Sequence, residues 1–396
     1  MTSQFSSPQP APIIFDGWRS ISISLFMALV GYSVMVSVPV LSSAMVAKLG
    51  FTEEQVGRVW GADLGGMSLG SVLAAFLVAR VNRRMLVLAG VILSVGGNAL
   101  CMGMAEYDPV LWLRVATGVG SGIFTAIAVV TLGGTSNPVR AFNMLLFAFA
   151  FSTALELHVL PMLTMDGIYL FFIGLAVACL LFLKWVPARH LNAEELARQE
   201  KIEEDKDENW HLPRIFPVFC LTAVCFTYIN IGGYYTYIEL AAFSDGVTAE
   251  WTGPVLTWSS IFAIVGCGIA LVCARFGMFR PLFAGLIAMA ASVMMVSGGI
   301  TKYNFMVSIF AFMTLWTFAD VYQSAMLAHM DRKGSMVALL PSVQALGQSI
   351  GPNIAASVIA AGLGYSVMFL VSGSMALVAM AIYMGISAYM HKHRSV

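Results

Sequence analysis

The sequence predicts an all-α membrane protein whose twelve transmembrane helices form two pseudo-symmetric halves of six, and three observations lead to this fold class. First, 59% of the residues are hydrophobic, 11% are charged and the mean hydropathy is +0.83, so the chain is far more apolar than a soluble domain. Second, the apolar residues fall into twelve long segments. Third, the two halves share residue patterns at a constant spacing.

Each of the twelve segments holds about 20 residues or more, the length that crosses about 30 Å of hydrocarbon. They are expected near residues 20–45, 56–79, 85–105, 109–133, 141–164, 166–186, 215–240, 251–274, 280–300, 304–328, 334–362 and 364–390. The one long polar segment lies between the sixth and the seventh. We therefore expect a six-helix bundle at 20–186, a cytoplasmic linker at 187–214, a second bundle at 215–390, and cytoplasmic tails at 1–19 and 391–396.

The distribution of Lys and Arg orients the chain, because cytoplasmic loops of membrane proteins carry an excess of these residues. With twelve spans, 17 of the 21 basic residues fall on the side of both termini and the linker, 3 fall on the other side, and Arg114 falls inside a span. Both termini are therefore expected in the cytoplasm, with the protein in a plasma membrane of the bacterial inner-membrane type. The net charge of +0 does not indicate a nucleic-acid partner.

The two halves resemble one another in sequence. Arg140, Met144 and Glu156 of the fifth expected span align with Arg332, Met336 and Gln348 of the eleventh, at an offset of 192 residues. Duplicated six-span halves are typical of transporters whose site lies at the interface between the repeats.

Arg114 is the most costly residue of the chain to place, since it lies within the fourth expected span. Inserting an Arg into a membrane costs at least about 2.5 to 3.5 kcal/mol, so it is retained only where a partner, an aqueous cavity or a ligand receives it. Gly118, Gly120 and Gly122 follow on the same helix and let a neighbouring backbone approach closely. We expect a tightly packed helix that presents one cation to a polar group.

Asp63 and Glu156 are expected at about the depth of Arg114, from a rise of about 1.5 Å per residue. Our hypothesis is that Arg114 pairs with one of them and that the remaining carboxylate carries a proton, because an uncompensated charge is unfavourable in a low-dielectric medium. The alternatives are a static structural pair for Arg114 and a packing or gate role for Asp63.

Polar and aromatic residues of the second half are candidates for the lining of a cavity. They are Tyr228 and Asn230 in the seventh span, Trp316 and Asp320 in the tenth, and Gln344 and Gln348 in the eleventh. Asp320 is a second candidate proton carrier or a partner for an inner gate, since intramembrane carboxylates are usually functional. Tyr237 and Glu239, near the outer end of the seventh span, are expected in an interfacial aromatic belt.

The sequence gives no indication of an enzyme. It contains no evident nucleotide-binding loop, metal-ligand spacing or Ser/His/Asp arrangement, and the glycines at 118–122 lie inside a span, where they cannot cradle phosphate. The six cysteines lie in apolar stretches without a CxxC pair and are interpreted as packing residues. No cofactor or metal is expected, and an ion gradient would supply the energy.

Two motifs make the chain resemble the major facilitator superfamily, and the resemblance extends over essentially its whole length. The segment 75–84 resembles the family's basic loop between spans two and three, with Ala79 in place of the usual Asp. Arg114 followed by Gly118 resembles the family's fourth-span motif. The Gly-Pro signature of antiporters is absent from the fifth span, 142–161, which argues against a drug/proton antiporter.

The resemblance implies a secondary transporter that works by alternating access, and the candidate residues take their expected roles from it. The basic residues Arg80, Arg83, Arg84 and Arg275 are expected in gating; Arg114, Tyr228, Asn230, Trp316, Gln344 and Gln348 in substrate binding; and Glu156, Asp63 and Asp320 in proton coupling.

The expected function is proton-coupled uptake of a small organic anion or metabolite by a monomer embedded in membrane lipid. In families that this chain resembles, the fourth-span Arg is associated with proton coupling or with substrate carboxylates. The alternative is proton-driven export of amphipathic metabolites or drugs, which the large apolar content favours and the missing fifth-span signature weakens. A transporter-like receptor is the third possibility.

Overall fold

The computed structural model describes residues 15–78, 80–188, 215–331 and 336–393, and over these ranges the chain is helical with no strand. The first half contains α1 (Trp18–Leu49), α2 (Glu53–Leu77), α3 (Arg83–Cys101), α4 (Tyr107–Gly133), α5 (Pro138–Val159) and α6 (Met165–Leu181). The second contains α8 (Ile215–Ser244), α9 (Ala249–Ser259), α10 (Phe262–Cys273), α11 (Phe279–Met294), α12 (Lys302–Met330), α13 (Leu340–Ala360) and α14 (Gly364–His393). Most of the expected linker and tails lies outside the described residues, as do Ala79 and Arg332.

The observed helices confirm the predicted fold class. Within the described residues, nine helices are long and apolar enough to cross a membrane, α9 and α10 counting as one span that is interrupted at 260–261. The apolar helices α6 and α11 are shorter, and α13 carries polar side chains along its length. The α11 helix ends at Met294, earlier than the expected 300, because the chain turns at 295–298 and Gly299 has a φ of 106°.

Local sequence signals set several helix ends. Thr52 and Thr301 each open a helix with a capping box, in which the Thr hydroxyl accepts from the third residue of the helix and that residue's side chain accepts from the Thr backbone N–H. Gly50 ends α1 in the left-handed conformation, with a φ of 71°, and a residue with a Cβ would be strained there.

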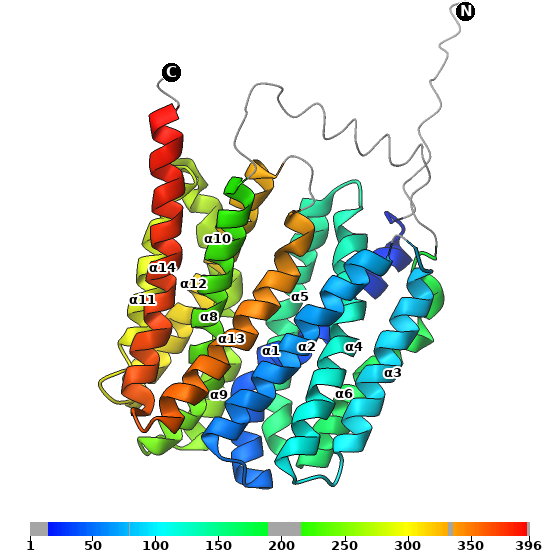
Figure 1. The fold of residues 1–396 in the computed structure, drawn as a ribbon, viewed down its shortest axis with the longest axis horizontal. Coiled ribbons are helices and arrows are strands. Elements are labelled where there is room, and N and C mark those ends of the chain that lie inside the picture. The colour runs from blue at the N-terminus through cyan, green and yellow to red at the C-terminus, as the bar shows by residue number, and fades with distance from the viewer. Residues whose placement is uncertain (1–14, 79, 189–214, 332–335, 394–396) are drawn as a thin grey trace, which may run out of the picture.

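The helices run side by side as two neighbouring bundles, with α1–α6 in one and α8–α14 in the other (Figure 1). We call the face at which α1 begins and α14 ends the terminal face, and the other end of the bundle the opposite face. In the first half α4 packs against α1, α2 and α3, and in the second half α8 packs against α13 and α14. The two halves meet where α2 packs against α13, α1 against α8, and α5 against α9.

Candidate functional site

Arg114 and Asp63 form a buried ion pair between α4 and α2. Arg114 Nη2 lies 2.5 Å from Asp63 Oδ2, and the two residues are 0% and 1% exposed. Arg114 Nη1 also donates to Asn98 Oδ1 at 2.8 Å, and its guanidinium carbon lies 5.4 Å from the centroid of the Trp60 ring. All of these partners belong to the first half, so the cation ties α2, α3 and α4 together.

Glycines on both helices permit the close approach that the sequence predicts. A Cβ atom on Gly118 would lie 2.8 Å from the backbone carbonyl carbon of Asp63 and 3.0 Å from the backbone nitrogen of Met67. A Cβ atom on Gly66 would lie 3.1 Å from the carbonyl carbon of Val115. Real Cβ atoms rarely come this close to a backbone, so only glycine fits where α2 and α4 cross.

Glu156 lies apart from this pair, on α5, and is 2% exposed. Its Oε2 accepts a hydrogen bond from Ser37 Oγ of α1 at 2.6 Å, and its Oε1 accepts one from Ser152 Oγ at 3.0 Å. Among the described residues, the ion pairs are Arg58 with Glu54 and Arg114 with Asp63, so no cation pairs with Glu156 there. The carboxylate is therefore buried with hydroxyl donors and without a countercharge.

A second carboxylate, Asp320 of α12, is held by aromatic residues of the second half. Tyr228 Oη lies 2.9 Å and 2.8 Å from the two Asp320 oxygens and donates to this carboxylate. Trp316 Nε1 donates to Tyr228 Oη at 3.3 Å. Tyr228 and Trp316 are buried, whereas Asp320 is partly exposed. Tyr32 of α1 is within electrostatic range of Asp320, so this cluster reaches the other half.

Tyr235 connects the two carboxylates across the interface between the halves. Its Oη donates to the backbone oxygen of Val36 at 3.0 Å, next to Ser37, and it is within electrostatic range of Glu156. Its ring centroid lies 5.7 Å from that of Trp316. We call the set made up of Glu156, Ser37, Tyr235, Trp316, Tyr228 and Asp320 the central cluster.

Sequence reasoning identified four members of the central cluster and missed Ser37 and Tyr235. The spacing of Ser33 and Ser37, four residues apart on one face of α1, was the available signal. The other expected substrate residues form no described hydrogen bond with members of the central cluster. Asn230 is fully buried and donates to the backbone oxygen of Ser372 at 2.7 Å, which ties α8 to α14.

Two glutamines of α13 complete the set of expected substrate residues. Gln348 is 2% exposed, and its Oε1 has no hydrogen-bond partner among the described residues. Gln344, one turn earlier, is partly exposed. An unpaired amide oxygen is a ready acceptor for a ligand donor, so the substrate role of these residues stays a prediction.

The expectation that Tyr237 and Glu239 form an interfacial belt is wrong, because the two residues are 0% and 4% exposed. Tyr237 Oη donates to the backbone oxygen of Glu53 at 2.9 Å. Glu239 accepts from Ser43 Oγ at 2.7 Å and from Thr252 Oγ1 at 3.2 Å. The end of α8 packs against α1 and α2 of the other half. This contact buries the side chains of Tyr237 and Glu239, so they are not exposed at the surface of the helix bundle.

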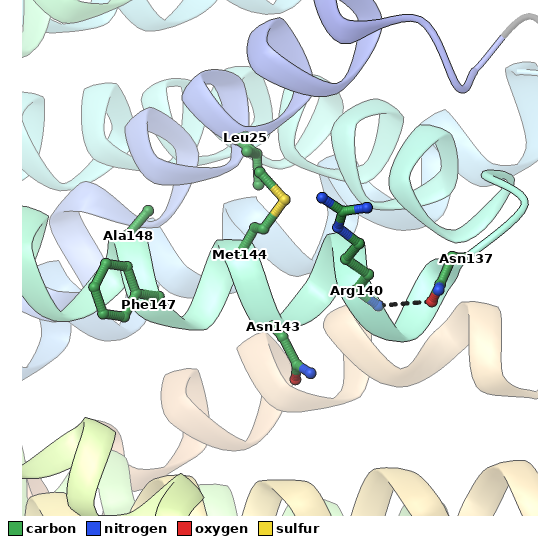
Figure 2. Close-up of a pocket in the computed structure, with 7 residues that line it drawn as sticks. All are labelled: Leu25, Asn137, Arg140, Asn143, Met144, Phe147 and Ala148. Atoms are coloured by element: carbon green, nitrogen blue, oxygen red, sulfur yellow. Dashed lines mark hydrogen bonds between the residues drawn. The ribbon is translucent and has the colours of Figure 1, made fainter.

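Most of the described hydrogen bonds between the halves lie toward the opposite face. Besides those of Glu239 and Tyr237, Arg58 donates to the backbone oxygen of Asn353 at 3.2 Å and to Ser357 Oγ at 3.0 Å. Nearer the terminal face, a cavity of about 600 Å³ lies along α5 beside α1 (Figure 2). Nearer the terminal face the halves are also joined, since Ser68 Oγ of α2 donates to the backbone oxygen of Ser342 of α13 at 2.8 Å.

The four arginines expected in gating contact only their own half among the described residues. Arg83 donates to Thr131 Oγ1 at 3.2 Å, and Arg84 donates to the backbone oxygens of Val186 at 2.8 Å and Lys184 at 2.7 Å. The remaining two lie at the terminal ends of the second and eighth spans: Arg80 is exposed, and Arg275 lies over the ring of Phe276. Their gating role stays a prediction.

Two packed bundles of largely apolar, membrane-length helices are typical of secondary transporters. The profile of the Major Facilitator Superfamily matches residues 22–352, and the chain belongs to this family. No curated protein matches the sequence significantly.

Solved structures of transporters share the fold. A D-xylose-proton symporter is 17% identical, with 92% of this chain and 97% of that chain covered and a TM-score of 0.71. The nucleoside transporter NupG is 12% identical, with 92% and 98% covered and a TM-score of 0.65. The human organic anion transporter MFSD10 (TETRAN) is 14% identical, with 92% and 98% covered and a TM-score of 0.63. At these identities the likeness concerns the fold alone.

Proposed function

We propose that this transporter couples a proton gradient to the uptake of a small organic anion or metabolite, as a monomer in a bacterial inner membrane with both termini in the cytoplasm. The observation that carries the proposal is Glu156, a buried carboxylate without a described countercharge. It accepts a hydrogen bond from the neighbouring helix α1 and is within electrostatic range of Tyr235 of the other half.

Proton binding at Glu156 would act directly on the interface between the halves. When ionised, Glu156 carries an uncompensated charge in a low-dielectric environment and depends on the Ser37 and Ser152 hydroxyls. When protonated, it loses that dependence. Because Val36 accepts from Tyr235 of the other half, a shift of α1 around residues 36–37 changes a contact between the halves. This is the kind of small local change that packed interfaces convert into domain rocking.

Asp320 is the corresponding carboxylate of the second half in this proposal. Tyr228 donates to it, and Trp316 donates to Tyr228, so its charge state is linked to the aromatic residues that we propose to line the substrate pocket. Asp63 is a weaker candidate for proton coupling, since Arg114 already balances its charge.

The distribution of contacts between the halves supports alternating access. The described hydrogen bonds of Glu239, Tyr237 and Arg58 hold the halves together toward the opposite face, and the α5 cavity lies near the terminal face. With both termini in the cytoplasm, these hydrogen bonds lie on the outer side of the membrane and would close the path from the outside. Transport would require the contacts at the opposite face to break. In exchange, the basic loops that contain Arg80–Arg84 and Arg275 would each form contacts with the other half.

The fold does not select the substrate, since its neighbours are named for a sugar, a nucleoside and organic anions. Arg114 could receive a substrate carboxylate only by exchanging Asp63 for it, because the pair is fully buried. In our proposal Arg114 therefore acts mainly through the position of α4.

Replacing the carboxylate tests the proposal directly. In proteoliposomes with a pH gradient, Glu156→Gln should abolish gradient-driven accumulation of a labelled metabolite, while exchange of that metabolite without a gradient continues. Glu250→Gln, which changes an exposed carboxylate at the opposite face, is the matched control. Proton-driven accumulation that is unchanged in Glu156→Gln would remove Glu156 from the coupling role.

A second candidate is proton-driven export of amphipathic compounds. Two carboxylates among aromatic rings in the central cluster favour it, since this chemistry suits a positively charged nitrogen. Efflux of labelled lipophilic cations from energised cells, without uptake of any anion, would support export over import.

A further inference from the structure

We propose that the cavity between α1 and α5 near the terminal face is a binding subsite for an amphipathic organic monoanion. Arg140 would receive the carboxylate, and the apolar side chains of Leu25, Met144 and Phe147 would receive the body of the molecule. The place of this subsite on a transport path rests on the proposed function, whereas the binding itself does not.

The cavity has the volume of a small-molecule site and is open on one side, where Arg140, Met144 and Phe147 are exposed. Its volume is about 600 Å³, and ligand pockets typically measure about 300 to 1,000 Å³. Six residues at or near the start of α5 line it together with Leu25 of α1; they are Asn137, Arg140, Asn143, Met144, Phe147 and Ala148. In Figure 2, Arg140 and Met144 project from the side of α5 that faces Leu25, while Asn143 projects from the other side.

Arg140 is the cation of this cavity and is available to a ligand. Its side chain is exposed, and its guanidinium makes no hydrogen bond or ion pair with any residue that the structure describes. Asn137 caps the helix by accepting from the Arg140 backbone N–H at 3.0 Å, which fixes the start of α5 without using the guanidinium. Among the residues that the structure describes, none of those that line the cavity is acidic. This differs from Arg114, whose charge Asp63 neutralises.

The composition of the lining selects an anion with an apolar body. A guanidinium binds a carboxylate through two parallel charge-assisted hydrogen bonds, which a neutral amide cannot reproduce. Met144 and Phe147 add apolar surface one and two turns further along α5. Glu156 lies 16 residues beyond Arg140 on the same helix, about 24 Å along the axis. The α5 helix therefore connects the anion subsite to the proposed proton site.

Benzoate serves as the probe, with benzamide as its neutral counterpart. Binding is measured calorimetrically on the full-length protein in phosphatidylcholine nanodiscs, without a pH gradient. Benzoate should bind saturably, benzamide should bind at least about tenfold more weakly, and Arg140→Gln should weaken benzoate binding by about tenfold or more. Arg280→Gln, which changes an exposed arginine at the start of α11, should leave the affinity unchanged.

A second variant keeps the test independent of the loss of Arg140. Met144→Glu retains the guanidinium but places a carboxylate in the cavity, and it should also weaken benzoate binding by about tenfold or more. The melting temperature of each variant reports whether it is folded. Equal benzoate affinity in wild type and Arg140→Gln, or equal affinity for benzoate and benzamide, would overturn the proposal.

The headgroup of an anionic lipid could bind Arg140 in a similar way to a carboxylate substrate. A second experiment distinguishes these two ligands. In phosphatidylglycerol nanodiscs, native mass spectrometry measures the retained lipid. Arg140-dependent retention of phosphatidylglycerol, with no benzoate binding in phosphatidylcholine, would overturn the substrate subsite in favour of a lipid contact.

Measuring benzoate binding and proton-linked transport on the same preparation separates this inference from the proposed function. Arg140-dependent binding without any proton-linked transport would refute the proposed function but support the subsite. Proton-linked transport without Arg140-dependent binding would support the proposed function and refute the subsite.

Discussion

Neutralising either member of the Arg114–Asp63 pair should destabilise the protein, with a different dependence on pH for each. The pair is separated by 2.5 Å and is 0% and 1% exposed, so removing one partner leaves a charge that water does not reach. Breaking a buried ion pair in this way typically costs about 3 to 5 kcal/mol. Asp63→Asn should show this cost over the whole accessible pH range, because a guanidinium does not lose its proton.

Arg114→Gln should behave differently, because the remaining carboxylate can bind a proton. In the folded variant Asp63 has no described cation beside it and is favoured in its neutral form, whereas in the unfolded chain an Asp is ionised above about pH 4. Folding then takes up a proton, so stability rises as the pH falls. Stability should therefore be higher at pH 5 than at pH 8, by at most about 1.4 kcal/mol for each pH unit, because a single proton is bound.

The assay is denaturant unfolding of the purified variants in nanodiscs, followed by tryptophan fluorescence at pH 5 and pH 8. The double variant Asp63→Asn with Arg114→Gln leaves two neutral groups that can bond to each other, and it should recover most of the lost stability. Glu54→Gln is the control, since the Glu54–Arg58 pair is 3.5 Å apart with side chains 45% and 33% exposed, and such pairs contribute about 0 to 1 kcal/mol. Single variants within about 1 kcal/mol of wild type, or an Arg114→Gln variant without pH dependence, would refute this reasoning.

Two further predictions concern helix packing and the contact at the opposite face. Gly118→Ala should lower the free energy of unfolding by about 1 to 3 kcal/mol, because its Cβ would meet the backbone of α2. The control Gly96→Ala, with no atom within 4 Å of the new Cβ, should be neutral or slightly stabilising. Equal melting temperatures for the two variants would contradict this prediction. Glu239→Ala should remove the acceptor of the Ser43 hydroxyl, which is the described hydrogen bond of Glu239 that crosses between the halves, and so favour their separation at the opposite face. A hydrogen bond to a charged group contributes about 1.5 to 3 kcal/mol. Spin labels at the exposed positions 47 and 250 should then report a larger population of long distances, and an unchanged distance distribution would argue against a latch role for Glu239.

The sequence was sufficient for the helices because length and hydropathy are local properties. It also indicated a partner for Arg114, since a cation in a span requires one, and depth along the helices narrowed the choice to two carboxylates. It did not indicate that Glu239 is buried, because a polar side chain near the end of a helix can contact either lipid headgroups or a neighbouring helix. That difference depends on how the halves meet.

The central cluster was only partly predictable for the same reason. Tyr228, Trp316 and Asp320 stood out because their polar atoms are costly in a span, and they do contact one another. Ser37 and Tyr235 did not stand out, since a hydroxyl in a span is a less costly group than a carboxylate and can hydrogen-bond to a backbone carbonyl of its own helix. Their significance comes from contacts between segments that are distant in the sequence: Ser37 with Glu156 within the first half, and Tyr235 with Val36 across the interface between the halves.

The described charges of the central cluster connect the proposed anion to the proposed proton. Asp63 balances Arg114 within the first half, so the uncompensated described charges of the central cluster are the two carboxylates Glu156 and Asp320. An anion that moves from Arg140 to within about 5 Å of an ionised carboxylate meets a repulsion of about 3 kcal/mol at an effective dielectric constant of about 20. Protonation of that carboxylate removes the repulsion, so an anionic substrate could occupy the centre only together with a proton. Import of an anion by this chain should therefore be electroneutral or electropositive, and substrate-induced proton uptake by the purified protein should disappear in Glu156→Gln if that residue is the carrier.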